Sequence, residues 1–587
     1  MRLELDRLEV IAGGTTAGVP LRSSGAHSLA GLEVAVATGG GPRYCWTLAN
    51  PGPRAATVRA VALVFRLEDE REPLRLFRHG HQSWSPAGTA TLGVDRDPSL
   101  EGAIDLARDL YHADPAVVAR PEELRSEWVT VLADAGTAAP LLLGFEGGTT
   151  HDGTIRVCRG DAGIEVRAEA FLGDAILHPG ECRPLHGVVV DDRPDAGVGA
   201  SERLEAWATA VGRLGGARID APYQSGWCSW YHYFHDVSET ALRANLAHAA
   251  EWPFDVFQLD DGFQRSIGDW LVTNERFPSG LEGVARAIVA AGRRPGLWIA
   301  PFLAAPDSEV VRTHPGWLAR QPAGDDPLLG MFNPAWGGGR DGWMYVLDTT
   351  RPDVLAHLER LARALVDTGF GYLKLDFTYA PGLGGRFADP ARAPAERVRA
   401  GFEAVRRGAG DATFLLGCGA PLASAVGLVD GMRIGPDVAP RWHLPPDRVL
   451  IPAYRDSEPA TVHAARATLA RAFMHRALWL NDPDCVMLRT EHTELSPEQL
   501  RTWARLVGVS GGMALVSDDL GLLGDTARAT FAEVTALGRA SDAAAKAGTP
   551  PRCPDLLGPA GPSRLEGGRA AIALDPGTGA STVVARA

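Results

Sequence analysis

The chain has 587 residues, of which 45% are hydrophobic and 22% are charged, as in an ordinary soluble globular protein. This length is too great for one compact core, so we expect two to four domains. A formal net charge of -14 argues against a nucleic-acid partner and against an anionic membrane surface.

The amino terminus and the cysteines indicate the cellular compartment. The first residues mix charged and apolar side chains and lack the apolar core of a signal peptide. No charge-free window reaches the length of a membrane-spanning helix. The seven cysteines are scattered, without a CxxC pair, which favours a reducing environment and argues against a zinc site. We therefore expect a cytoplasmic protein that binds no metal.

Residues 1–200 carry short runs of alternating apolar and polar residues, broken by Gly, Pro and Asp. Such spacing is typical of a β-sandwich. The clearest runs lie at residues 32–36, 57–65, 127–132 and 163–169. One segment, His79-Gly-His-Gln-Ser-Trp-Ser-Pro86, is too polar and too aromatic for a core strand. It could lie across a neighbouring sugar site or form only a structured turn.

After a linker helix at residues 201–221, strand-length apolar runs alternate with amphipathic segments of helix length. This alternation predicts βα units, and eight of them over residues 222–524 predict a (β/α)8 barrel. The expected strands span residues 223–230, 254–260, 296–302, 371–377, 413–417, 431–434, 478–481 and 513–517. The expected helices include residues 239–250, 281–291, 352–368 and 394–407.

Two further regions complete the predicted fold. Residues 305–350 form a long insertion in the barrel, rich in Trp, Gly and Pro, which could face a substrate or serve packing alone. Residues 525–587 end in two short apolar runs and predict a small C-terminal β-domain. The expected fold class is multidomain α/β and β, with an N-terminal β-sandwich, a central (β/α)8 barrel and a C-terminal β-domain.

Functional side chains of such a barrel collect at the carboxyl ends of its strands. Carboxylates, cations and tryptophans follow those ends in this chain. They are Trp227, Cys228, Trp230, Asp260, Asp261, Lys374, Asp376, Cys418, Arg433, Asp437, Asp482 and Asp484. His232 and His235 lie in the loop after the first strand, where ordinary polar roles fit better than a two-histidine metal site.

Lys374 and Asp376 are two residues apart in a predicted strand, so their side chains point the same way. Ionised groups on the inner side of a barrel strand are costly unless they are paired or used. A neighbouring cation keeps a carboxylate charged, which is the state that a nucleophile needs. A purely structural ion pair explains the same pattern equally well.

Several carboxylates, one Arg, one Lys and several Trp around one barrel mouth suit a neutral polyol as substrate. Tryptophan supplies a flat apolar platform for a pyranose ring, and charged groups accept hydrogen bonds from hydroxyls. Two carboxylates can cleave a glycosidic bond with retention when they lie about 5–5.5 Å apart, or with inversion at about 6.5–9.5 Å.

Several short motifs occur in one order along the chain. They are Gln82-Ser-Trp-Ser85, Gly226-Trp-Cys-Ser-Trp-Tyr231, Gln258-Leu-Asp-Asp-Gly-Phe263, Gly296-Leu-Trp-Ile-Ala-Pro301, Lys374-Leu-Asp376, Cys418-Gly-Ala-Pro421, Arg433-Ile-Gly-Pro-Asp437 and Asn481-Asp-Pro-Asp484. In this combination the chain resembles the clan D glycoside hydrolases, specifically the α-galactosidases of glycoside hydrolase family 36 and their raffinose-synthase-like relatives. It departs from them at Phe263, where many relatives have Trp, and in the motif that ends at Asp437, which differs from the Trp-x-Ser-Asp-Asp type of the large tetrameric members.

The resemblance implies a role for each matching residue. Asp376 would be the nucleophile and Asp437 the acid/base. The substrate-binding residues would be Asp260 and Asp261 at the 4- and 6-hydroxyls, Lys374 and Arg433 at the sugar, Trp230 stacked on the ring, Cys418 near the 2-hydroxyl, and Trp84. The resemblance implies no cofactor and no metal.

Some of these residues also have a structural interpretation. Cys418 could be only a small buried hydrophobe, and Asp484 could only shape a loop. Arg433 and Asp437 could form a salt bridge, although the proline between them disfavours the helix that usually brings such a pair together. Trp227 fits the core better than a sugar platform.

We expect a retaining exo-α-galactosidase that hydrolyses small-molecule or oligosaccharide α-galactosides by double displacement. The alternatives are a galactosyl-transferring, raffinose-synthase-like enzyme, a non-catalytic carbohydrate-binding protein and a metal-dependent barrel hydrolase. The natural aglycone stays open, and so does assembly into a homo-oligomer.

Overall fold

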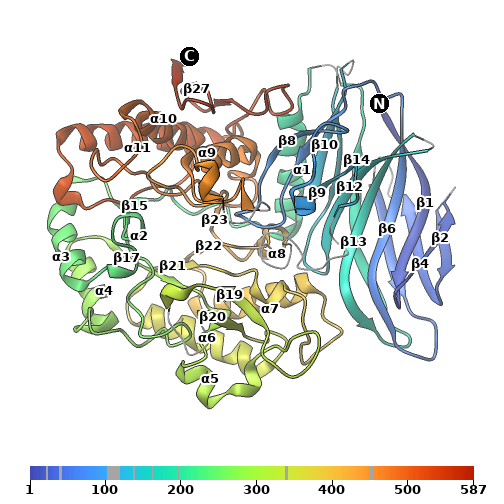
Figure 1. Cartoon of the computed structure of the whole chain (residues 1–587), viewed down its shortest axis with the longest axis horizontal. Helices are drawn as coiled ribbons and strands as arrows, with labels where there is room; N and C mark the ends of the chain where they lie inside the picture. Colours follow the sequence, from blue (N-terminus) through green and yellow to red (C-terminus); the bar gives the residue numbers. More distant parts are fainter. Residues whose placement is uncertain are drawn as a thin grey trace.

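Figure 1 shows a computed structural model of the chain, with the sandwich on the right and the barrel on the left. The structure describes the chain except for residues 22–23, 39–42, 102–118, 136–138, 162, 196, 337–341, 450–453 and 587.

The N-terminal region is a β-sandwich of two antiparallel sheets, as predicted. Alternation sets its inner face: in β4 the apolar residues Leu32, Val34 and Val36 are buried, and the residues between them are partly exposed. One sheet has the order β2-β1-β6-β13-β12-β9, and its strands are β1 (Arg2–Ala12), β2 (Thr15–Pro20), β6 (Ala56–Glu68), β9 (Glu123–Glu127), β12 (Asp152–Gly160) and β13 (Gly163–Leu177). The other has the order β3-β4-β5-β14-β11-β10-β7-β8, and its strands are β3 (Gly25–Leu29), β4 (Leu32–Thr38), β5 (Arg43–Ala49), β7 (Arg75–Arg78), β8 (Gly88–Thr91), β10 (Val129–Ala133), β11 (Leu141–Phe145) and β14 (Cys182–Asp191).

Helix α1 (Ala200–Gly215) connects the sandwich to the barrel and packs against both. Its Trp207 lies edge-on to Trp128 of the sandwich at 4.9 Å between ring centroids, and 6.3 Å from Phe473 of the barrel. The linker helix predicted for this region is therefore also the packing element between the two domains.

The central region is a nearly closed barrel of eight parallel strands in the order β24-β23-β22-β21-β17-β16-β15-β25. Each predicted strand is present, and a bridge between Val486 and Val516 joins the two ends of the sheet. The strands are β15 (Ser225–Cys228), β16 (Val256–Leu259), β17 (Arg294–Ile299), β21 (Tyr372–Leu375), β22 (Phe414–Gly417), β23 (Gly431–Arg433), β24 (Leu480–Asp482) and β25 (Ala514–Val516).

The helices around the barrel follow from the amphipathic segments between the strands. In α6, Val354, Leu358 and Leu365 form one buried stripe, which is the helical period expected for a helix that covers a sheet. The helices are α2 (Trp230–Tyr233), α3 (Glu239–His248), α4 (Gly280–Ala290), α5 (Glu309–Thr313), α6 (Pro352–Asp367), α7 (Pro394–Ala409), α8 (Leu422–Ala425), α9 (Thr461–Ala470) and α10 (Pro497–Ser510).

The insertion at residues 305–350 supplies two strands of a small antiparallel sheet beside the barrel mouth, and the third strand, β18, directly precedes it. The strands of this sheet are β18 (Leu303–Ala304), β19 (Leu329–Phe332) and β20 (Trp343–Val346), in the order β18-β20-β19. Trp317 of the insertion is buried and donates its ring N–H to Asp353 of α6 at 2.9 Å, so this tryptophan serves packing.

The C-terminal region differs in content from the β-domain expected over residues 525–587. It begins with the 22-residue helix α11 (Asp525–Lys546), which packs against α10 of the barrel. This stretch is rich in alanine, the strongest helix former, and buries Phe531 and Val534. The β-structure follows as a three-stranded sheet of β26 (Arg564–Glu566), β27 (Ala570–Leu574) and β28 (Ser581–Ala585).

No helix in the described part of the chain is long and apolar enough to cross a lipid bilayer.

Candidate active site

A cavity of about 420 Å³ opens at the carboxyl ends of the barrel strands. All the predicted site residues line it except Arg433 and Cys418. The rest of the wall comes from β19, Trp336 and Trp343 of the insertion, from Trp298, Phe377 and Tyr379 of the barrel, and from residues 454 and 457–459. Aromatic rings and carboxylates thus share one enclosure, which suits a sugar ring and its hydroxyls.

Asp376 follows β21 and is held in one orientation by its neighbours. The ring N–H of Trp298 donates to Oδ2 at 2.9 Å, and the backbone N–H of Phe377 donates to Oδ1 at 2.9 Å. Phe377 has a φ of 51°, in the left-handed region that bulky residues rarely adopt.

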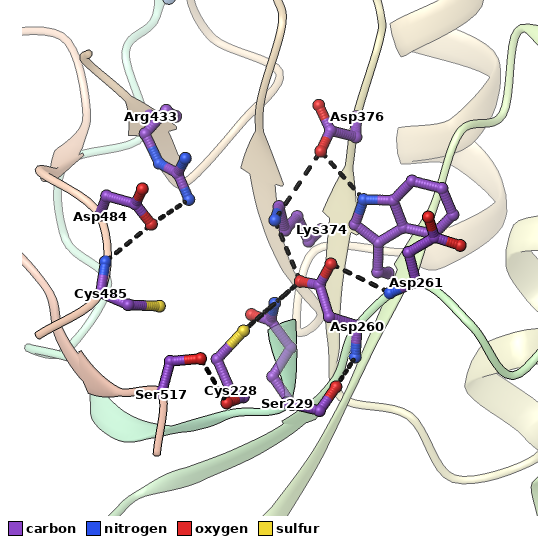
Figure 2. A network of polar contacts seen from close by, with 12 residues as sticks. Cys228, Ser229, Asp260, Asp261, Lys374, Asp376, Arg433, Asp484, Cys485 and Ser517 are labelled. Atoms are coloured by element: carbon purple, nitrogen blue, oxygen red, sulfur yellow. Dashed lines mark hydrogen bonds and ion pairs between the residues drawn. The ribbon is translucent and has the colours of Figure 1, made fainter. Parts of the chain in front are cut away.

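Lys374 links two carboxylates, as Figure 2 shows. Its Nζ lies 3.0 Å from Oδ2 of Asp260 and 3.7 Å from Oδ2 of Asp376. Burial alone lowers the pKa of Lys374, but the two carboxylates outweigh it and hold the pKa well above its usual value. The lysine therefore stays positively charged beside Asp376, as its position two residues away predicted.

Asp260 and Asp261 follow β16 and have different surroundings. Asp260 Oδ2 accepts hydrogen bonds from Gln258 and Lys374, and Oδ1 accepts the backbone N–H of Asp261 at 3.0 Å. Its carboxylate is nearly inaccessible, with 2% of the side chain exposed. These hydrogen bonds fix the orientation of the Asp260 carboxylate, and so the directions in which it can accept a further hydrogen bond.

Asp261 is fixed by side chains from three loops. Gln264 donates to Oδ1 at 2.6 Å, and the ring N–H of Trp336 donates to Oδ2 at 2.6 Å. His235 Nδ1 lies 3.2 Å from Oδ2. The insertion, for which a substrate-facing loop was one of two expectations, therefore reaches into the cavity through Trp336.

Arg433, at the end of β23, is surrounded by three carboxylates. It lies 3.0 Å from Asp437, 3.0 Å from Asp482 and 2.8 Å from Asp484. Its side chain is 3% exposed and does not line the cavity. The salt bridge to Asp437 forms without a helix, so Arg433 positions Asp437 from behind.

Asp437 is the most exposed of these carboxylates, with 35% of its side chain accessible. Burial raises its pKa above the usual aspartate range, and the charge of Asp376 acts in the same direction. Arg433 and Lys374 oppose this shift. Asp437 thus holds a proton more readily than an ordinary aspartate, which is the property of a general acid.

Asp484, for which the sequence favoured a structural role, anchors the loop that carries Asp437. Its Oδ2 accepts the hydroxyl of Tyr231 and the backbone N–H of Val438, the latter at 2.9 Å. Burial raises the pKa of Asp484 to about 6, with Arg433 opposing the shift. These contacts support a structural role.

The remaining predicted residues fall into two groups. Trp230 and Trp84 line the cavity, and Trp84 reaches it from the sandwich. Cys418 is fully buried behind the wall, and burial raises its thiol pKa far above the usual value. Trp227 is a core residue stacked on Phe257 at 4.3 Å.

The sequence profile of the melibiase family matches residues 227–380. A solved structure, the alpha-galactosidase TtGalA from Thermus thermophilus, is 28% identical over 91% of this chain and 94% of its own, with a TM-score of 0.64. Residues 227–380 thus resemble the melibiase family, and the chain as a whole shares its fold with an alpha-galactosidase.

Other melibiase relatives match over shorter stretches or in fold alone. Alpha-galactosidase AgaA from Geobacillus stearothermophilus is 30% identical over 226 residues, which is 37% of this chain and 29% of that protein. An alpha-galactosidase from Escherichia coli is 27% identical over 25% of this chain and 20% of its own length. The sequence matches thus span less than a third of these curated relatives. A crystal structure of an AgaA variant shares the fold at 15% identity and a TM-score of 0.61.

The melibiase match covers only part of the site. It includes Asp260, Asp261, Lys374 and Asp376, but ends before Asp437. The role of Asp437 therefore rests on its position in the cavity and on its surroundings.

The sequence assigned no individual role to two residues that hold the carboxylates of this site. Trp298 pairs in register with Lys374 on the adjacent strand, and its place inside a strand rather than at the end hid it from a search of strand ends. Trp336 lies 75 residues from its partner Asp261. Its signal was the abundance of tryptophan in the insertion.

Proposed function

We propose that the chain is an exo-α-galactosidase that hydrolyses terminal α-D-galactosyl residues with retention of configuration. The proposal is carried by Asp376 and Asp437, two carboxylates in contrasting environments at one cavity. The similarity to TtGalA supports it, because that protein was crystallised with p-nitrophenyl α-D-galactopyranoside and, separately, with stachyose.

In the first step, a carboxylate oxygen of Asp376 attacks the anomeric carbon and forms a covalent ester. The bond from that carbon to the leaving oxygen breaks, and Asp437 transfers its proton to the leaving oxygen. The N–H of Trp298 holds the Asp376 carboxylate in one orientation for attack, and the Lys374 ammonium lies 3.7 Å from it. The raised pKa of Asp437 favours the protonated form, which is the form that donates to the leaving oxygen.

In the second step, Asp437 takes a proton from a water molecule, which attacks the same carbon and releases Asp376. Two displacements at one carbon restore its configuration. Both carboxylates return to their starting states, and the cycle calls on no cofactor and no metal.

Galactose recognition is assigned to the floor of the cavity. Asp260 and Asp261 accept hydrogen bonds from the 4- and 6-hydroxyls, Lys374 contacts the sugar, and Trp230 covers a face of the ring. Arg433 acts through Asp437, and Cys418 packs behind the site. Charged acceptors already fixed by neighbours bind hydroxyls with little loss of side-chain freedom.

The test is hydrolysis of 4-nitrophenyl α-D-galactopyranoside, with the released sugar followed by proton NMR. We expect α-galactose to appear first and to mutarotate later. Initial β-galactose would overturn retention, and transfer of galactose to added sugar acceptors in place of hydrolysis would favour the transferase. No hydrolysis of any aryl glycoside would favour a non-catalytic carbohydrate-binding protein.

A further inference from the structure

A second cavity, of about 480 Å³, adjoins the segment that carries Asp437. Pro436 is part of its wall, whereas the next residue lines the active-site cavity. The other walls come from β7 and β8 of the sandwich, from α9 of the barrel and from residues 560–562 and 576 near the C-terminus. Three regions of the chain thus enclose it.

The charge of this cavity is unlike that of the molecule. Four arginines line it, Arg78, Arg96, Arg455 and Arg466, against two aspartates, Asp95 and Asp456. The chain as a whole has a net charge of -14. The arginines come from two stretches far apart in sequence, residues 78–96 and 455–466, and they are not consecutive in either, so no basic run in the sequence indicates the cavity.

Three of these guanidinium groups have no close partner among the described residues, although the charge of Arg78 helps to lower the pKa of Asp97. Within the described residues, the side chains of Arg78, Arg96 and Arg466 form no hydrogen bond or ion pair. Asp97, which lies near Arg78, is instead paired with Arg125 at 3.6 Å. The cavity therefore keeps unused donors on several sides.

The nearby polar groups leave those donors available. Asp95 accepts the backbone N–H of Thr91 at 2.7 Å. His463, which is 8% exposed, has its Nδ1 2.8 Å from the carbonyl oxygen of Glu458. That contact fixes the imidazole ring in the wall.

Several guanidinium forks around one space are complementary to an oxyanion with many acceptor oxygens. A phosphate group can accept from several arginines at once, whereas a single carboxylate offers only two oxygens. The volume of about 480 Å³ slightly exceeds that of the sugar-sized active cavity, about 420 Å³. We infer that this cavity binds a small phosphorylated molecule of about sugar-phosphate size.

The position of the second cavity lets a ligand bound there influence the active site through a shared segment of the chain. Tyr454, Ser457 and Glu458 line the active cavity, and Arg455 and Asp456 between them line the second one. A phosphate bound in the second cavity would contact this shared segment and the Pro436 turn and so restrain them. Binding therefore alters the kinetics of galactoside hydrolysis, a consequence that rests on the proposed function.

Binding is tested by calorimetry on the full chain, with inorganic phosphate and glucose 1-phosphate as probes and sodium chloride of equal ionic strength as the blank. We expect saturable binding of both probes, tighter for the sugar phosphate. Equal affinity for the two would assign the site to free phosphate alone. No saturation at about 10 mM of either probe, where a millimolar site would be largely filled, would overturn the inference.

Single variants locate the site. Arg78→Gln and Arg466→Gln should each weaken binding at least about tenfold, because each removes a charge-assisted hydrogen bond. Arg286→Gln is the matched control, since that side chain is 72% exposed on α4 and lies 3.9 Å from its acidic neighbour Glu282. Equal loss in the control, or no loss in the two cavity variants, would contradict the assignment.

Kinetics test the coupling separately. Phosphate should change kcat or KM for the aryl galactoside in the wild type but not in Arg78→Gln, whose rate without phosphate should be unchanged. Phosphate binding that leaves the kinetics unaltered would overturn the coupling between the two cavities but not the phosphate site itself. A chain without galactosidase activity that still binds phosphate would overturn the proposed function instead.

Discussion

Asp376 and Asp437 carry the same functional group, and their neighbours give it opposite properties. Asp376 receives two N–H donors and lies near the cation of Lys374, so its carboxylate is held in one orientation. Asp437 loses hydration on burial and feels the charge of Asp376, which favours its protonated form. This contrast assigns nucleophile and acid without reference to position in the sequence.

Replacing Asp376 by glycine tests the nucleophile. The variant should lose at least about 1000-fold in kcat, because the covalent route is closed. Added azide should restore turnover and give β-galactosyl azide, since azide enters the space on the face from which Asp376 attacks. Recovery of α-galactosyl azide, or near-wild-type rates without azide, would contradict the assignment.

Replacing Asp437 by alanine tests the acid/base. Loss of the proton donor should slow the hydrolysis of melibiose about 100- to 10,000-fold. The first step should slow much less for an aryl galactoside, because its good leaving group needs little protonation. In the wild type, kcat/KM should fall as the pH rises through the pKa of Asp437, because only the protonated form donates. The variant should lack this alkaline limb, and a limb that persists would assign the proton donor to another group.

The element that distinguishes this barrel mouth is the insertion with β18, β19 and β20. It brings Trp336 onto Asp261, which also receives Gln264 from the loop after β16. A loop from one part of the barrel thereby fixes a carboxylate presented by another. Preorganisation of this kind lowers the cost of binding a hydroxyl.

Trp336→Phe should keep the ring and remove only the hydrogen bond to Asp261. A hydrogen bond to a charged group is worth about 1.5–3 kcal/mol, so kcat/KM for the galactoside should fall about 10- to 100-fold. Trp343→Phe is the matched control, because Trp343 lines the same cavity and is not among the described donors to Asp261. Equal losses in both variants would mean that the indole acts by shape alone.

The elements of the barrel could be predicted because each strand and helix has its own local period. The ends of β16, β21 and β23 then placed Asp260, Asp376 and Asp437 near one another, since parallel strands present their carboxyl ends together. Contacts across long sequence separations could not be read in this way. Trp336 and the arginines of the second cavity belong to this class, because only the folded chain brings their partners or neighbours close.

The C-terminal helix α11 shows a different limit. The two apolar runs near the chain end predicted strands, and β27 and β28 do form there. The preceding residues 525–546 were included with them, although their alanine content favours a helix. Treating residues 525–587 as one region obscured the change from a helical pattern to a strand pattern within it.

At the scale of the molecule, the sandwich contributes to the active site rather than merely flanking it. Trp84 reaches the cavity from the segment between β7 and β8, and its ring lies 5.0 Å from that of Phe377. A bridge between Gln82 and Pro421 ties the same segment to the barrel. The site is therefore complete only when the two domains are docked.

Arg471 holds this docking together and provides its test. The side chain is fully buried, and its guanidinium donates to Ser83 O at 2.7 Å, Ile434 O at 2.9 Å and Gln82 O at 3.2 Å. Burial lowers its pKa to about 9, which still leaves it charged at neutral pH.

Arg471→Met should remove the side-chain donor to Ser83 O and Ile434 O, at a cost of about 1–3 kcal/mol each, whereas Gln82 O still accepts the backbone N–H of Ser85 at 3.0 Å. The midpoint of thermal denaturation should fall by several degrees, and kcat/KM should fall with it because Trp84 is no longer fixed against Phe377. Arg471→Lys keeps the charge but cannot reach every carbonyl from one ammonium group, so its losses should be intermediate. A methionine variant as stable and active as the wild type would mean that the sandwich segment is held by packing alone, and that the polar contacts between the domains contribute no net stability.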